Sequence, residues 1–205
     1  MLDYGIFYEF IPMDTFGTPN QKVVRLSQVE LFKNYAMVIT TNGGLWRYLI
    51  GDTVRFTSLS PYRIRVTGRT KHHINVFGEE LMVENTDQAL AKACQETQSE
   101  IVDYTVAPIF MEGKQKGAHE WMIEFKTPPK DLTLFHKILD STLQSLNSDY
   151  EAKRYNNMTL NPLVINVARE NLFYDWLKQR NKVGGQNKIP RLSNQREYLE
   201  QLKEL

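Results

Sequence analysis

A change of pattern near residue 69 constrains the fold of this chain more than any other feature. Before it, short apolar-rich stretches follow one another between turn residues, which is typical of an all-β region. After it, stretches of strand length alternate with longer stretches that have helical spacing. The sequence therefore predicts a β-rich part at residues 1–68 and an α+β part at residues 69–205, with the boundary in the stretch TGRTK.

The first part is expected to be built from short strands. Its strand candidates are YGIFYEFI, QKVVRL, SQVEL, YAMVITT, WRYLIGDTVRF and RIRVTGR. Within WRYLIGDTVRF, a tight turn at Gly51-Asp52 is expected to separate two strands. Several short strands at close spacing predict a small barrel or sandwich. A sheet of so few short strands has open edges. We therefore expect a barrel-like part that is incomplete and needs further strands or a cover.

The second part has the element order β-α-β-β-α-β, which is typical of a ferredoxin-like fold. Its strand candidates are HINVFG, IVDYTVAPIF, HEWMIEFK and LVINVA. The two intervening helices are expected to begin at caps formed by Asn85 and Asp131. A further helix near residues 170–180 and a short terminal helix capped by Asn194 complete the predicted part. The fold class is therefore α+β.

Composition excludes several functional classes. The chain has 205 residues and a formal net charge of +1, so no overall field attracts nucleic acid or an anionic membrane. Cys94 is the only cysteine, which excludes an intramolecular disulfide and a zinc site with several cysteine ligands. The stretch MLDYGIFYEF lacks the basic residues of a signal peptide, and no apolar run could span a membrane. We therefore expect a cytoplasmic protein without nucleic acid or membrane partners.

The stretch YLIGDTVRF holds the first candidate for chemistry. Gly51 permits a tight turn, and Asp52 would then present two oxygens at its tip. A carboxylate in that position can accept hydrogen bonds from both vicinal hydroxyls of a ribose. The alternative is structural, because Gly-Asp is a common turn dipeptide in which the aspartate caps its own turn.

A basic cluster in VTGRTKHHINVFGEEL is the second candidate. Arg69, Lys71, His72 and His73 lie near one end of it, so a hairpin would place these cations at the junction of the two parts. The alternative is a solvated basic turn. Adjacent histidines in a strand point to opposite faces, and neither has an acidic or cysteine partner at ligand spacing, so no metal ligand is assigned.

The third candidate is Lys188 in GGQNKIPRL. The preceding glycine pair predicts a mobile loop, and the following proline stiffens its far side, so the lysine could swing towards a phosphate. The alternative is an ordinary surface lysine. Other reactive side chains are expected to be structural, with Cys94 as an inert core thiol and His119 and His136 as isolated surface or core-edge residues. The sequence contains no glycine-rich phosphate loop.

In this order and spacing, the three stretches resemble the C-terminal signature of the adenylate-forming superfamily. The closer resemblance is to the Gretchen Hagen 3 family, also called the auxin-responsive promoter family, of acyl-acid amido synthetases. The stretches YEFIP, FGEEL and NKIPRL are similar to those of its bacterial members. The matching residues are Tyr48, Gly51 and Asp52 in the first stretch, Gly68, Arg69, Lys71, Ile74 and Gly78 in the second, and Gly185 and Lys188 in the third.

The resemblance implies a role for several of these residues. Asp52 would accept hydrogen bonds from the ribose hydroxyls of ATP and of the acyl-adenylate. Arg69 would lie beside the ribose or at the hinge. Lys71 would be the hinge about which the small C-terminal domain rotates between adenylation and transfer. Lys188 would approach the α-phosphate as the catalytic residue.

Two neighbours of Asp52 complete the implied nucleotide site. Tyr48 belongs to the same motif and would be one of the cofactor-binding residues. Arg55 would pair with a phosphate or with Asp52, and the alternative for Arg55 is a structural salt bridge. No metal ligand is implied within this chain, because the family holds Mg²⁺ mostly upstream of the matching stretches.

The resemblance also implies a reaction. The full-length parent would activate a carboxylic acid with ATP, in the presence of Mg²⁺, to form an acyl-adenylate and pyrophosphate. An amine, in particular an amino acid, would then take the acyl group. This chain would be the C-terminal portion of that enzyme, with residues 1–68 in the large adenylation domain and residues 69–205 as a mobile lid. Because the family places the triphosphate and acyl sites upstream, we expect this portion to be inactive by itself.

Two alternative functions stay open at this point. A ferredoxin-like scaffold also suits a stand-alone module that binds or senses a small ligand, because one fold hosts many functions. Acyl transfer to coenzyme A instead of an amine would use the same residues. The acid, the acceptor and the oligomeric state are not specified by any residue of this chain.

Overall fold

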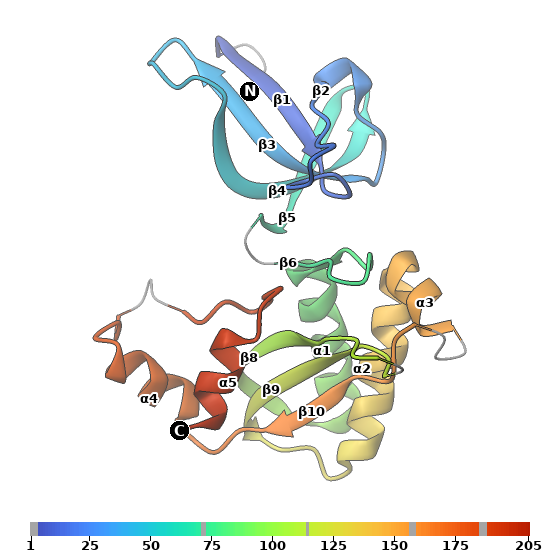
Figure 1. Cartoon of the computed structure of the whole chain (residues 1–205), viewed down its shortest axis with the longest axis vertical. Helices are drawn as coiled ribbons and strands as arrows, with labels where there is room; N and C mark the ends of the chain where they lie inside the picture. The colour runs from blue at the N-terminus through green and yellow to red at the C-terminus, as the bar shows by residue number, and fades with distance from the viewer. Residues whose placement is uncertain (1–3, 71–72, 114, 156–158, 185–187) are drawn as a thin grey trace. The chain divides into compact units, whose positions relative to one another are not determined.

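The computed structural model describes residues 4–70, 73–113, 115–155, 159–184 and 188–205 (Figure 1). The chain forms two compact units, Met1–Lys71 and His72–Leu205. Within the described residues, no helix is both long and apolar enough to cross a membrane. Each unit has its own hydrophobic core, and each is treated separately below.

Unit 1 is a five-stranded antiparallel sheet with the strand order β2-β1-β3-β4-β5. Its strands are β1 (Ile6–Pro12), β2 (Val24–Arg25), β3 (Asn34–Thr41), β4 (Tyr48–Leu59) and β5 (Tyr62–Arg69). Because side chains alternate across a strand, the sheet carries an apolar cluster on each face. Phe10, Tyr35 and Phe56 pack edge to face in one cluster, and Ile11 and Ala36 belong to the other.

The described strands of unit 1 form an open sheet, which agrees with the expected open edges but does not confirm the barrel-like detail. The outer strands β2 and β5 lie at opposite edges of the sheet and do not pair with each other. The stretch SQVEL was expected to be a strand, but residues Leu26–Gln28 form a 3-10 turn instead. Here the Gln28 side chain accepts a hydrogen bond from the Arg25 backbone N at 3.0 Å, which favours a turn over an extended chain.

Unit 2 is an α+β unit built around a three-stranded sheet with the order β10-β9-β8. Its strands are β6 (His73–Ile74), β7 (Leu81–Met82), β8 (Glu100–Ile109), β9 (Ala118–Thr127) and β10 (Val164–Val167). Its helices are α1 (Val83–Thr97), α2 (Leu132–Leu146), α3 (Ser148–Arg154), α4 (Leu172–Gln179) and α5 (Glu197–Lys203).

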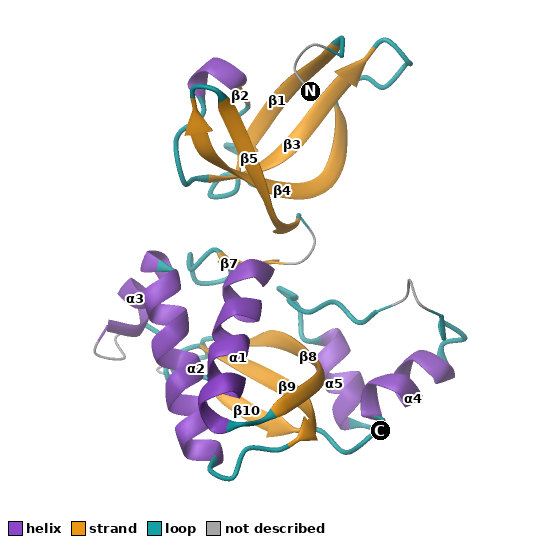
Figure 2. Cartoon of the chain, turned by 180° about the vertical axis from the view of Figure 1, so that it is seen from behind, coloured by secondary structure: helices purple, strands orange, loops and turns teal. Residues whose placement is uncertain are grey.

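Helices cover both faces of this sheet (Figure 2). Trp121 and Ile123 of β9 point into the larger core, which also contains buried residues of α1 and α2. Met122, between them, points to the opposite face and packs with residues of α4 and α5. On that face, both carboxylate oxygens of Glu124 accept backbone hydrogen bonds at the start of α4, which fixes this helix on the sheet.

The α+β class is confirmed, but the ferredoxin-like sheet is not formed. The elements follow the expected order along the chain. However, β10 pairs directly and in parallel with β9, whereas a ferredoxin-like sheet would insert the first strand between them. That strand pairs only within the separate hairpin of β6 and β7. The reason is local, because β6 holds only His73–Ile74, after which the Asn75 side chain accepts a hydrogen bond from the Glu80 backbone N.

The predicted helix caps have mixed outcomes. Asp131 caps α2 as expected and accepts hydrogen bonds from the backbone N atoms of Thr133 and Leu134. Asn85 does not cap α1, because the helix begins two residues earlier, and the Asn85 side chain accepts from the Met82 backbone N instead. Asn194 does not cap α5, which begins only at Glu197.

Candidate active site

The stretch that carries Asp52 is one continuous strand, β4, rather than two strands separated by a turn. The register between β3 and β4 shifts between Ala36 and Val38, so β4 bulges at this point. Gly51 takes a φ of +90° within the bulge, which a residue with a side chain would rarely adopt. The Thr70 backbone N donates a hydrogen bond to the Gly51 carbonyl at 2.9 Å and holds the bulge against the end of β5.

The bulge brings two predicted site residues together. Asp52 lies opposite Arg69 in the register of β4 and β5. The Arg69 Nε atom is 3.2 Å from Asp52 Oδ1, and the two side chains are 62% and 37% exposed. A carboxylate with this exposure and one arginine neighbour can still accept hydrogen bonds from a ligand. The pair therefore forms an accessible site for a polar ligand on unit 1.

The two other candidates on β4 have different surroundings. Tyr48 is about half exposed at the start of the strand, opposite Ile39. Arg55 lies opposite Asn34, and its Nε atom donates to the Asn34 side-chain oxygen at 3.3 Å. Asp52 thus forms its ion pair with Arg69. Lys71 and His72 lie outside the described residues.

Lys188 belongs to unit 2, and its side chain is exposed. The preceding residues 185–187 lie outside the described part of the chain. The next residue, Ile189, is only 3% exposed and belongs to the core between the sheet and helices α4 and α5. The chain is therefore anchored directly after the lysine, on the side that the proline was expected to stiffen, and the expected mobility of the glycine side stays a prediction.

The electrostatic surroundings of Lys188 include a desolvated carboxylate. Burial raises the pKa of Asp103 on β8, although the Tyr104 backbone N and the charges of Arg191 and Lys188 act in the opposite direction. Asp103 Oδ1 accepts a hydrogen bond from the backbone N of Tyr104 at 2.9 Å. Lys188 and Arg191 thus share the field of one carboxylate at this edge of the sheet.

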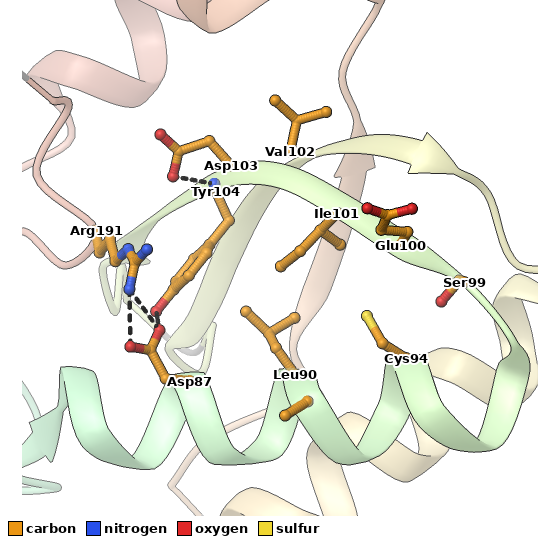
Figure 3. Close-up of a pocket in the computed structure, with 11 residues that line it drawn as sticks. Asp87, Leu90, Cys94, Ser99, Glu100, Ile101, Val102, Asp103, Tyr104 and Arg191 are labelled. Carbon is orange, nitrogen blue, oxygen red and sulfur yellow. Dashed lines mark hydrogen bonds and ion pairs between the residues drawn. The ribbon is translucent and has the colours of Figure 1, made fainter. Parts of the chain in front are cut away.

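Sequence reasoning missed a network beside this lysine. Arg191 donates through Nη1 to both carboxylate oxygens of Asp87 on α1, at 2.9 and 2.7 Å. The Tyr104 hydroxyl donates to the same carboxylate at 2.6 Å, and the guanidinium lies over the Tyr104 ring at 5.3 Å (Figure 3). Burial is the main cause that raises the pKa of Tyr104, so its hydroxyl stays protonated as a donor. Only the spacing of Lys188 and Arg191 in NKIPRL could have indicated this arrangement.

The same network closes one end of a pocket of about 450 Å³ between α1 and β8 (Figure 3). Its apolar wall includes Leu90, Cys94 and Ile101, with Glu100 and Asp103 on the strand side. Burial raises the pKa of the Cys94 thiol. A thiol with a raised pKa is a poor nucleophile, so Cys94 fits the structural role expected from the sequence.

A second cluster contradicts the expected setting of His119. This residue is buried, and its Nε2 atom lies 2.8 Å from Glu79 Oε1, with both side chains fully buried. Glu79 belongs to the stretch FGEEL, and its other oxygen accepts from the Phe77 backbone N at 2.7 Å. Strand β7, helix α1 and strand β8 lie between these residues in the sequence, so no local pattern could have paired them. The pair fixes the loop that follows the predicted hinge.

The residues present fit parts of ATP but not a metal ion. A carboxylate beside an arginine suits the hydroxyls of a ribose, and an exposed lysine suits a phosphate oxygen. Within the described ranges, no group of three His, Cys, Asp or Glu side chains gathers that could hold a metal. No Mg²⁺ ligand is therefore assigned among the described residues.

Comparisons with known proteins identify the family to which both parts of the chain belong. Residues 1–69 match the GH3 family central domain, and residues 84–197 match the GH3 family C-terminal domain. The succession of the two domains defines a chain of GH3 type. The protein belongs to the GH3 family, which confirms the resemblance to the Gretchen Hagen 3 family.

Relatives with known names share low but extended similarity. The chain is 28% identical over 204 residues to indole-3-acetic acid-amido synthetase GH3.3 of Arabidopsis thaliana, covering 90% of this chain and 33% of the relative. It is 24% identical over 204 residues to 4-substituted benzoates-glutamate ligase GH3.12 of the same organism, covering 90% and 35%. This chain thus spans about one third of the length of the curated relatives it matches.

A solved structure shows the same fold. The GH3.15 acyl acid amido synthetase aligns with a TM-score of 0.67 and 22% sequence identity. The alignment covers 97% of this chain and 36% of that structure. The fold of both units therefore occurs within a larger synthetase.

Proposed function

We propose that this chain supplies the ribose clamp and the lid of an ATP-dependent acyl-acid amido synthetase. The whole enzyme would activate a carboxylic acid as an acyl-adenylate and pass the acyl group to an amine, in particular an amino acid. The observation that carries the proposal is the match of both GH3 domains in one chain, each with its own candidate nucleotide-binding residues. The names of two relatives, an amido synthetase and a benzoates-glutamate ligase, support the reaction type.

The role of Asp52 follows from its chemistry. Its carboxylate would accept hydrogen bonds from the two ribose hydroxyls, which are charge-assisted and stronger than neutral ones. Arg69, already 3.2 Å from Asp52, would hold the carboxylate in place or lie beside the ribose. Tyr48 and Arg55 would border the same nucleotide. In this proposal, unit 1 binds the nucleoside and does not act on the phosphorus.

The role of Lys188 follows from the charge that develops in the reaction. Attack of a substrate carboxylate on the α-phosphorus increases negative charge on the equatorial oxygens. An ammonium fixed beside these oxygens stabilises that charge, and it does so more strongly once water is excluded. Residues 69–205 would deliver Lys188 by rotating as a lid about a hinge at Lys71. Residues 1–68 would belong to the large adenylation domain.

Pyrophosphate exchange tests this proposal directly. The full-length protein that contains this chain should exchange labelled pyrophosphate into ATP only when a suitable carboxylic acid from a panel is present. The chain of 205 residues alone should give no exchange, because it covers about one third of its relatives. Exchange without any acid, or strong exchange by the chain alone, would contradict the proposal. Supplying amino acids or coenzyme A as acceptors would then distinguish an amide product from a thioester.

A further inference from the structure

Lys188 sits at the head of a segment that is fastened to the edge of β8. The Thr105 hydroxyl donates to the Pro190 carbonyl at 2.7 Å. The Val106 backbone N donates to the Arg191 carbonyl at 2.9 Å, and the Ser193 backbone N returns a bond to the Val106 carbonyl at 3.1 Å. The segment therefore behaves as a short added strand that begins immediately after the lysine.

Two side chains of the same segment are buried in the cores of unit 2. Ile189 is 3% exposed in the core beside α4 and α5, and Leu192 is fully buried in the core beside α1 and α2. Beyond them, Asn194 accepts a hydrogen bond from the Asn75 backbone N and donates one to the His73 carbonyl. The segment is thus fixed at both ends to the body of unit 2.

Arg191 supplies a polar anchor that reaches across to α1. Its guanidinium binds both oxygens of Asp87 and stacks over Tyr104, whose hydroxyl binds the same carboxylate. A bidentate arginine contact fixes direction as well as distance. Because only Ile189 and Pro190 lie between these two cations, the direction of the Arg191 backbone limits where the Lys188 ammonium can lie. Figure 3 shows this network at the end of the pocket.

We propose that Arg191, held by Asp87, is a positioning residue for Lys188. This inference rests on the proposed function, because it assigns Lys188 the catalytic contact with the α-phosphate. The lysine is then delivered by movement of unit 2 as a body, and not by a swinging loop. Because the backbone after Lys188 is already ordered, the lysine loses less conformational entropy when it binds the phosphate.

A double-mutant cycle in the full-length enzyme tests the proposal. Arg191→Ala should lower the rate of pyrophosphate exchange by on the order of 10- to 100-fold, as expected for a misplaced catalytic group. In a Lys188→Ala background, Arg191→Ala should have no further effect, because both changes remove the same contribution. Arg191→Lys should restore part of the rate. Transfer of the acyl group from added acyl-adenylate should stay within about twofold of wild type in all these variants, whereas a general structural defect would lower it.

Matched variants keep the test decisive. Arg169→Ala removes a similar ion pair on unit 2, with Asp175 at 2.8 Å, and should leave exchange unchanged. If Arg191→Ala does not fold, Asp87→Asn and Thr105→Val can replace it, because each removes one anchor with little change of side-chain shape. Each should lower the rate of pyrophosphate exchange as Arg191→Ala is expected to do. Each should also have no further effect on that rate in the Lys188→Ala background. Hydrogen exchange of the Ser193 amide should accelerate in each of these variants, since its bond to Val106 depends on the fastened segment.

Two outcomes separate failure of this inference from failure of the proposed function. The positioning role is overturned if Arg191→Ala lowers pyrophosphate exchange further in the Lys188→Ala background. It is also overturned if folded Arg191→Ala exchanges at the wild-type rate. In both cases a defective Lys188→Ala variant leaves the proposed function standing. If Lys188→Ala exchanges at the wild-type rate, the proposed function loses its catalytic lysine, and this inference fails with it.

Discussion

At the scale of single residues, the exposure of the Asp52 carboxylate on unit 1 depends on the backbone conformation of Gly51. Gly51 adopts a φ of +90°, and a Cβ built at this position would lie 3.8 Å from an Arg69 side-chain nitrogen. This distance is an ordinary van der Waals contact, so a Cβ would not clash. Glycine is favoured here because of the positive φ and not because of a lack of space. The resulting bulge places Asp52 opposite Arg69 with its carboxylate partly exposed.

Asp52 gives the first prediction. In the full-length enzyme, Asp52→Ala should weaken ATP binding by on the order of 10- to 100-fold, because charge-assisted hydrogen bonds to the ribose are lost. Wild type should also bind 2′-deoxy-ATP and 3′-deoxy-ATP more weakly than ATP, whereas Asp52→Ala should no longer distinguish them. Calorimetric titration with the three nucleotides measures this. Equal discrimination by the variant and wild type would place the ribose elsewhere.

Glu120 gives a prediction about pH. Burial acts to raise its pKa, but hydrogen bonds from Lys203, Arg196 and Asn166 outweigh burial and leave the pKa of Glu120 lowered. A carboxyl whose pKa is lowered on folding stabilises the protein above its unfolded pKa of about 4.3 and loses this contribution as the pH falls through the folded value. Glu120→Gln should therefore destabilise the protein at neutral pH and flatten its loss of stability in acid.

Thermal unfolding between neutral and acidic pH measures this difference. Glu100→Gln is a suitable control, because the pair of Glu100 with Lys126 is 2.8 Å long but more than half exposed on both sides. Exposed ion pairs contribute little, so this variant should follow the wild-type curve. A Glu120→Gln curve parallel to wild type at every pH would contradict the assignment.

At the scale of elements, the residues that decide where a helix starts could be predicted only where the contact is local. Asp131 caps α2 through its own next residues, and the sequence was sufficient to identify it. Asn194 looks like a cap in sequence but binds backbone atoms of β6 and of the loop after β6. Contacts of this kind depend on tertiary structure. Helix α3, whose Arg154 is buried against Asp140 of α2, was missed for the same reason.

The cap of α2 gives an element-scale prediction. Asp131→Ala should lower the free energy of unfolding by about 1 kcal/mol, because two backbone N–H groups at the start of the helix lose their acceptor. Asp131→Asn retains an acceptor oxygen and should recover most of the loss. Urea unfolding followed by circular dichroism measures both variants. An alanine variant as stable as wild type would show that these N–H groups are satisfied by water at no cost.

At the scale of the whole molecule, the sequence predicted two parts and the α+β class, because periodicity changes sharply near residue 69. It could not predict the sheet of unit 2, because strand length decides that arrangement. HINVFG has the pattern of a full strand, but Asn75 turns to accept from the Glu80 backbone N, and only His73–Ile74 remain in a strand. The candidate residues Asp52 and Arg69 were found from their order in the chain, whereas the anchoring of Lys188 required the fold.

The central claim is that Lys188 acts on the α-phosphate during adenylation without being needed to bind ATP. Pyrophosphate exchange by full-length Lys188→Ala, with ATP binding measured alongside, tests it most directly. We predict that exchange falls by on the order of 10²- to 10³-fold while ATP affinity stays nearly unchanged. Lys182→Ala, which removes another exposed lysine of the same unit, should have no effect. Wild-type exchange by Lys188→Ala would contradict the account.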